Sequence, residues 1–131
     1  MSRALQVGQE LEALTPGPVT RTQLALFAGA SGDHNPIHID LDFARAAGME
    51  DVIAHGMLSM AYVGRMLTDA VPIGNLLEWE VRFVAITPVH ARPTCRGTVT
   101  AIEDDIATID VRVVLEDGTT TLTGTAKVLV A

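Results

Sequence analysis

Cysteine and positive charge are both scarce in this sequence of 131 residues. Its single cysteine, Cys95, excludes an internal disulfide and a cysteine-based zinc site. Nine lysines and arginines stand against sixteen acidic residues, so the net charge is −7 and no basic surface is expected for a phosphate backbone. We therefore expect neither a nucleic acid nor an anionic membrane surface as a partner.

Long apolar runs are also absent. The longest nearly apolar stretch, Met57 to Val71, carries Arg65 and Asp69 and is too short to span a bilayer. The first residues contain no apolar segment of the kind found in signal peptides, so none is expected. These features predict a cytoplasmic protein in a reducing compartment, with Cys95 as a strand residue and not a nucleophile.

The length and the 48% hydrophobic content suit one domain, expected over residues 1–131, with a single core. Thr20-Arg-Thr-Gln23 has the form of a capping box and predicts a helix that ends by Gly29 or Gly32. Asp40 is expected to cap a second short helix, Leu41 to Ala47.

From Gly56 to Val71, apolar residues occupy nearly every face, which predicts a helix enclosed by the rest of the chain. The remainder alternates with a period of two, as strands do, and Asp117-Gly118 predicts a two-residue hairpin turn. The expected strands are Leu5 to Leu14, the run that contains Trp79 to Ala85, Thr98 to Glu103, Ile106 to Glu116 and Thr119 to Val130. An antiparallel sheet wrapped around the helix would let both bury their apolar faces, so the predicted fold class is α+β.

The densest group of polar residues lies in Phe27-Ala-Gly-Ala-Ser-Gly-Asp-His-Asn-Pro-Ile-His38. Asp33, Asn35 and His38 fall within six residues, and Pro36 is expected to keep them out of a helix. Polar groups on a rigid loop are typical of functional sites. A carboxylate and an imidazole that flank one water can take its proton and return one to a substrate, because the pKa of histidine lies near neutral.

Two other interpretations of this segment stay open. Asp33 and Asn35 are residues that commonly form side-chain turns, and His38 could simply be a packing residue. A metal site would use His34 and His38, but two histidines four residues apart face one way only on a helix, and no third ligand is evident.

A second feature favours acid–base chemistry. Ala54-His-Gly-Met57 stands at the start of the apolar helix, where free backbone N–H groups and the helix dipole favour developing negative charge. Glycine at position 56 would let a ligand oxygen approach the main chain closely. A thioester carbonyl placed there would be polarised toward an enolate, although a glycine at a helix start is also common for purely structural reasons.

The segment Phe27-Ala-x-x-Ser-Gly-Asp-x-Asn-Pro-Ile-His38, followed by Ala54-His-Gly-Met57, resembles the hydratase motif of the MaoC-like, R-specific enoyl-CoA hydratase family. The resemblance extends over nearly the whole chain and implies a hot-dog fold, an antiparallel sheet around a long central helix. It is closest to the catalytic subunit of mycobacterial-type 3-hydroxyacyl-carrier-protein dehydratases.

The resemblance implies that Asp33 and His38 form the catalytic pair, that Asn35 orients the water or the substrate hydroxyl, and that the Gly56 N–H binds the thioester oxygen. The implied reaction is reversible syn addition of water to a trans-2-enoyl thioester, which gives the (R)-3-hydroxyacyl thioester. The implied setting is fatty-acid metabolism, with coenzyme A or an acyl-carrier protein as the carrier and with no metal or redox cofactor. Met57, directly after Gly56, is expected to line the acyl pocket.

One sheet around one helix would leave a free edge and an open face, so we expect a dimer, either of two copies or with a related hot-dog subunit. Two rival functions remain at this point. A hot-dog thioesterase would share the fold, since fold alone does not fix function. A non-catalytic partner subunit would have no need of Asp33 and His38.

Overall fold

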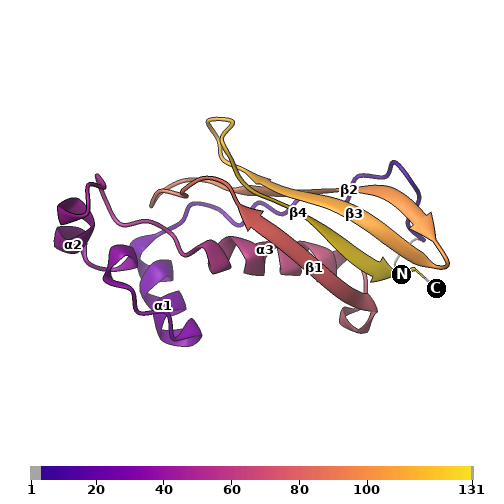
Figure 1. Ribbon diagram of the computed structural model, residues 1–131, viewed down its shortest axis with the longest axis horizontal. Coiled ribbons are helices and arrows are strands. Elements are labelled where there is room, and N and C mark those ends of the chain that lie inside the picture. The colour runs from indigo at the N-terminus through magenta and orange to yellow at the C-terminus, as the bar shows by residue number, and fades with distance from the viewer. Residues whose placement is uncertain (1–3, 131) are drawn as a thin grey trace.

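The computed structural model describes residues 4–130, which form a four-stranded antiparallel sheet with a long helix along one face (Figure 1). The helices are α1 (Arg21–Ser31), α2 (Leu41–Ala46) and α3 (Gly56–Ala70), the 3₁₀ turns are η1 (Pro36–His38) and η2 (Ile73–Asn75), and the strands are β1 (Leu76–Phe83), β2 (Thr94–Glu103), β3 (Ile106–Val114) and β4 (Thr120–Leu129). This arrangement confirms the predicted α+β class. Residues 1–3 and 131, which belong to the expected domain, lie outside the described part.

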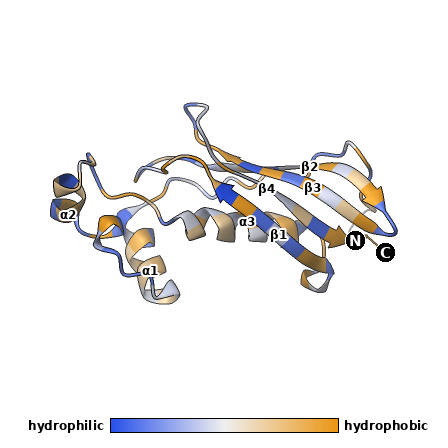
Figure 2. Cartoon of the chain, in the orientation of Figure 1, coloured by the Kyte–Doolittle hydropathy of each residue, from blue (hydrophilic) through white to orange (hydrophobic). Residues whose placement is uncertain are grey.

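The sheet has the strand order β1-β4-β3-β2, so β1 is one edge. Hydrophobic and polar residues alternate along its strands (Figure 2), and the apolar face packs on α3. Each fully buried aliphatic side chain in such a core stabilises the fold by roughly 1.5–3 kcal/mol. The fully buried members include Val63 and Leu67 of α3 and Ile109, Val111, Leu122 and Val128 of the sheet. This cluster is the larger of two apolar cores.

The prediction that α3 would be enclosed on all sides is wrong for this chain. One side of the helix is buried against the sheet, including Val63, Met66 and Leu67, but Met57 is 54% exposed. A single sheet covers only one side of a helix, so the apolar residues on the other side remain open to solvent.

The N-terminal strand expected over residues 5–14 is not a regular strand. The segment follows the edge of β2 through two isolated bridges, Glu10 with Thr98 and Leu14 with Cys95. Gly8 has a positive φ of 87°, which breaks the extended backbone at that point. The edge of β2 is therefore covered by an irregular segment.

The two hairpins differ from the prediction in their turns. Between β3 and β4, the carbonyl of Leu115 accepts from the N–H of Gly118 (2.9 Å), and Gly118 has a φ of 89°, so the turn has three residues and not two. The two-residue turn joins β2 to β3 instead. Its residues, Asp104 and Asp105, both have positive φ, at 52° and 63°.

Helices α1 and α2 lie beyond one end of the sheet (Figure 1). The predicted capping box is present, because Thr20 and Gln23 bond reciprocally at the start of α1, and Gly32 ends that helix with a φ of 77°. Asp40 caps α2 as predicted, through the N–H groups of Asp42 and Phe43. These helices form a second, smaller core whose fully buried members are Leu24 and Ala44. Within residues 4–130, no helix has the length and apolar character that a membrane crossing would need.

Candidate active site

The segment between α1 and α2 is held by side-chain turns. The carboxylate of Asp33 accepts from the N–H of Asn35 (3.3 Å), and the side chain of Asn35 accepts from the N–H of Ile37 (3.1 Å). Contrary to the prediction, Pro36 does not exclude a helix, because it begins the 3₁₀ turn η1 at a position where no N–H is needed. The turns that the structural interpretation predicted are thus present, and they carry His38 to the end of η1.

His38 is held in one orientation by the main chain. Its Nδ1 lies 2.7 Å from the carbonyl oxygen of Ile53, and because a carbonyl only accepts, Nδ1 carries the hydrogen. Nε2 is then free to take a proton, and it faces the carboxylate of Asp33 at 3.7 Å. This separation is too long for a direct hydrogen bond, but an oxygen placed about 2.8 Å from both groups would bond to each.

His55 contacts both Asp33 and His38, a role that the sequence analysis did not predict. Its ring is 1% exposed and stacks on the ring of His38, with centroids 3.8 Å apart and an interplanar angle of 23°. Its Nε2 contacts the carbonyl oxygen of Asp33 at 3.2 Å, and its ring makes an edge-to-face contact with the ring of Phe27. Burial, reinforced by repulsion from His38, lowers the pKa of His55, so this ring stays neutral. The motif Ala54-His-Gly-Met57 contained the signal, but only its glycine was given a role.

Asp33, His38 and His55 also form a group in which all candidate metal-binding atoms lie within 4.8 Å of one another. The lone pair of an imidazole nitrogen lies in the plane of its ring, and in nearly parallel stacked rings two such lone pairs do not converge on one ion. Nδ1 of His38 and Nε2 of His55 already contact carbonyl oxygens. The geometry therefore fits proton transfer better than metal coordination. His34, the other histidine considered as a ligand, is exposed and lies outside the group.

Gly56 and His38 line the same cavity, of about 270 Å³. Gly56 is the first residue of α3, where backbone N–H groups have no partner within the helix. A Cβ on this residue would lie 3.2 Å from the ring of Phe83, so the tight contact suits glycine. The structure thus brings Asp33, His38 and Gly56 together. It does not bring Met57 there, because that side chain is exposed and the cavity is lined by others.

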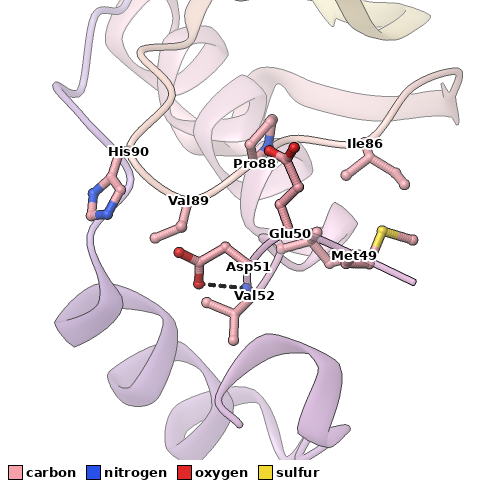
Figure 3. Close-up of a pocket in the computed structure, with 9 residues that line it drawn as sticks. Met49, Glu50, Asp51, Val52, Ile86, Pro88, Val89 and His90 are labelled. Atoms are coloured by element: carbon pink, nitrogen blue, oxygen red, sulfur yellow. Dashed lines mark hydrogen bonds between the residues drawn. The ribbon is translucent and has the colours of Figure 1, made fainter. Parts of the chain in front are cut away.

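Figure 3 shows the residues that line a second and larger hollow, of about 480 Å³. The two hollows share Ile53 and Ile86 in their walls. The carboxylate of Asp51 accepts two hydrogen bonds from the guanidinium of Arg21, at 2.8 and 2.5 Å. It also accepts one from the N–H of Val52. Two adjoining hollows of this kind offer an extended substrate more room than the first hollow alone.

Cys95 is the free thiol of the chain and takes no part in the cavity. It is fully buried, as expected of a strand residue, and burial raises the pKa of its thiol to about 12. A protonated thiol is a poor nucleophile.

The sequence is similar to the sequences of known proteins. The family model of the MaoC-like domain matches residues 3–121. The (R)-specific enoyl-CoA hydratase of Aeromonas caviae is 32% identical over 131 residues, which cover 97% of this chain and 96% of that protein. The 3-hydroxyacyl-thioester dehydratase Z of Mycobacterium tuberculosis is 30% identical over 92 residues, which cover 66% of this chain and 61% of that protein.

Solved structures give the same result. The (R)-hydratase of Aeromonas caviae, described as involved in PHA biosynthesis, superimposes with a TM-score of 0.89 at 30% identity, covering 99% of this chain and 100% of that chain. An unliganded R-hydratase from Pseudomonas aeruginosa gives a TM-score of 0.88 at 27% identity, covering 96% of this chain and 82% of that chain.

Proposed function

Because this chain belongs to the family of proteins with a MaoC-like domain, we propose that it catalyses the reversible syn hydration of trans-2-enoyl thioesters to (R)-3-hydroxyacyl thioesters. It is a hydro-lyase with a hot-dog fold, and its reaction belongs to fatty-acid metabolism. One observation carries the proposal: the carboxylate of Asp33 and Nε2 of His38 face each other at 3.7 Å, beside a cavity that Gly56 also lines.

The reaction follows from the positions of the two groups. A water held between Asp33 and His38 gives a proton to Nε2, and its oxygen bonds to C3 of the enoyl group. The electron pair of the double bond moves toward the thioester carbonyl, whose oxygen accepts from the N–H of Gly56. The proton then passes from the pair to C2, on the same face, and completes the hydroxyacyl thioester. Dehydration is the same sequence in reverse.

Asn35 and Met57 have supporting parts in this proposal. The side-chain oxygen of Asn35 is already bonded to the N–H of Ile37, so its amide NH₂ is the group left to orient the water or the product hydroxyl. Met57 is exposed on α3 and would contact the acyl chain only where a second subunit covers it.

We also propose a dimer, with two copies or with a related hot-dog subunit. The edge of β1 opposite β4 has no partner strand within the described sheet, and apolar side chains are exposed beside it. They are Met57 at 54%, Leu77 at 50% and Phe83 at 48%. Size-exclusion chromatography with light scattering is expected to give twice the chain mass, for one chain or for a co-expressed pair, and a clean monomer under both conditions would contradict it.

The carrier of the acyl group is coenzyme A or an acyl-carrier protein, and the reaction is proposed to take place in the cytoplasm. Both carriers present the same thioester to the cavity, so the chemistry above is unchanged. The relatives named above include an enoyl-CoA hydratase and a hydroxyacyl-thioester dehydratase, which supports thioester substrates of either kind.

The test is the loss of ultraviolet absorbance of a short trans-2-enoyl-CoA on addition of the purified protein. We expect rapid loss with the native chain and none with Asp33→Asn or His38→Ala. His34→Gln is the matched control, because His34 is exposed, adjacent to Asp33 in sequence and absent from the group of catalytic side chains. Loss of absorbance with release of free thiol would instead show a thioesterase, because hydration leaves the thioester bond intact and releases no thiol. Activity that survives in both dyad variants would refute the assignment.

A further inference from the structure

Thr121 lies at an irregularity in the sheet. Val113 pairs with Leu122 and Val114 pairs with Thr120, so Thr121 is an extra residue of β4 that has no paired residue on β3. Alternation fails at the same point, because Thr121 is 2% exposed and Leu122 is 0% exposed. A β-bulge of this kind redirects a side chain, and such bulges occur often beside active sites.

The hydroxyl of Thr121 is buried without a partner. Its Oγ1 has no hydrogen bond to any described residue, whereas its carbonyl oxygen accepts from the N–H of Val84 at 2.9 Å. Leaving a hydroxyl buried and unpaired is unfavourable, and valine would fill the same space without that penalty. The hydroxyl therefore serves no visible structural purpose in the chain itself.

The side chain lines the cavity that also contains His38, Gly56 and Phe83. In an enoyl thioester the acyl group has one hydrogen-bonding atom, the carbonyl oxygen, while the attacking water is held by Asp33 and His38. A cavity of about 270 Å³ has room for the reacting end of the acyl group. A donor in its wall would thus find the carbonyl oxygen as its partner.

We propose that the Thr121 hydroxyl is a second hydrogen-bond donor to the thioester oxygen, acting together with the N–H of Gly56. This inference rests on the proposed hydration reaction. The two donors come from different elements, the start of α3 and the bulge in β4, so the oxygen would be held from two directions. Negative charge develops on that oxygen during addition to C3, and a donor aimed at it acts mainly on kcat.

The test compares Thr121→Val, which keeps the shape, with Thr121→Ser, which keeps the hydroxyl. With crotonyl-CoA we expect Thr121→Val to lower kcat by at least about tenfold with little change in KM, and Thr121→Ser to stay within about threefold of the native chain. The melting temperature of Thr121→Val should be unchanged or higher, because an unpaired buried hydroxyl is removed. Thr123→Val, the same change two residues along β4 at an exposed position, is the control and should change neither quantity.

An infrared measurement tests the contact directly. In an Asp33→Asn background, bound crotonyl-CoA labelled at the carbonyl should show a lowered C=O stretching frequency, and adding Thr121→Val should reverse part of that shift. A kcat within about twofold of native for Thr121→Val, or a loss of kcat that tracks a lowered melting temperature, would overturn the proposal. A native chain without hydratase activity would overturn the proposed function and this inference with it. If the native chain is active and Thr121→Val leaves kcat unchanged, this inference alone would be overturned.

Discussion

Replacing His55 with phenylalanine separates what this residue does for the fold from what it does for the catalytic pair. Phenylalanine keeps a flat ring in contact with His38 and Phe27, where the native ring of His55 stacks on His38 at 3.8 Å and meets Phe27 edge-to-face at 4.9 Å. The variant loses the contact of Nε2 with the carbonyl of Asp33 and also removes Nδ1, which is buried and has no partner among the described residues.

These two losses act on stability in opposite directions. The lost hydrogen bond should destabilise the fold by about 0.5–1.5 kcal/mol, whereas removing an unpaired buried nitrogen should stabilise it by about 1–3 kcal/mol. The carbonyl of Asp33 belongs to an exposed residue and can accept from water instead. The larger phenyl ring adds some strain in a closed site. We expect a free energy of unfolding within about 1 kcal/mol of native at neutral pH.

The difference should depend on pH with a definite sign. In the unfolded chain His55 titrates near its ordinary pKa of 6.5, while in the folded chain burial, and then repulsion from His38, lowers its pKa. Below about pH 6.5 the unfolded native chain binds a proton there that the folded chain does not, so the native protein loses stability as the pH falls. His55→Phe lacks this loss, which approaches about 1.4 kcal/mol per pH unit, and groups that do not contact His55 cancel in the comparison.

Urea unfolding of both proteins at about pH 7.5 and about pH 5.5 measures this change. We expect the free energy of unfolding of the variant to increase relative to that of the native protein at the lower pH. Its kcat should fall, because the main chain at Asp33 is no longer held. His55→Gln keeps a donor but no ring, and it separates the two contacts. A variant destabilised by several kcal/mol at neutral pH would refute this account of His55. So would a difference in the free energy of unfolding that is the same at both pH values.

Three further predictions concern separate parts of the chain. Asp33→Asn should lower kcat by about 100-fold or more, while its melting temperature stays near native because the carboxylate is 49% exposed; absorbance assays and thermal melts check both. Gly124→Ala should lower the free energy of unfolding by about 3 kcal/mol or more, because its Cβ would overlap the carbonyl oxygen of Glu80 across the β1–β4 pair; a small change in a urea titration would contradict this. Cys95, whose pKa is raised to about 12 by burial, should react with a thiol reagent only as fast as the protein unfolds, so the rate should rise with urea.

Elements fixed by neighbouring residues were predictable from the sequence. The start of α1 follows from Thr20 and Gln23, which bond to each other within one turn, and the start of α2 follows from Asp40. The segment from Asp33 to His38 was found for the same reason, because its chemistry and its backbone restraints lie within a few residues.

Features that depend on distant contacts were not predictable. The exposed side of α3 reflects how much surface one sheet can cover, and the irregular segment at residues 5–14 reflects its pairing with β2. The role of His55 comes from its contacts with His38 and Asp33, which lie 17 and 22 residues earlier in the sequence. The bulge at Thr121 depends on the register between β3 and β4, which the sequence of β4 alone does not determine.

The proposed catalytic residues lie beside the smaller of the two apolar cores. Gly56 begins α3 between Ala54 and Leu58, which both belong to the small core, and Asp33 and His38 are carried by the segment between α1 and α2, beside the same core. The small core contains seven buried apolar residues and the large one fifteen, so the helical end should open at a lower free energy than the sheet. Amide hydrogens of α1 and α2 should then exchange before those of β3 and β4. Enzymatic activity would consequently be lost on heating while the sheet is still intact, and its thermal limit would be that of the smaller core.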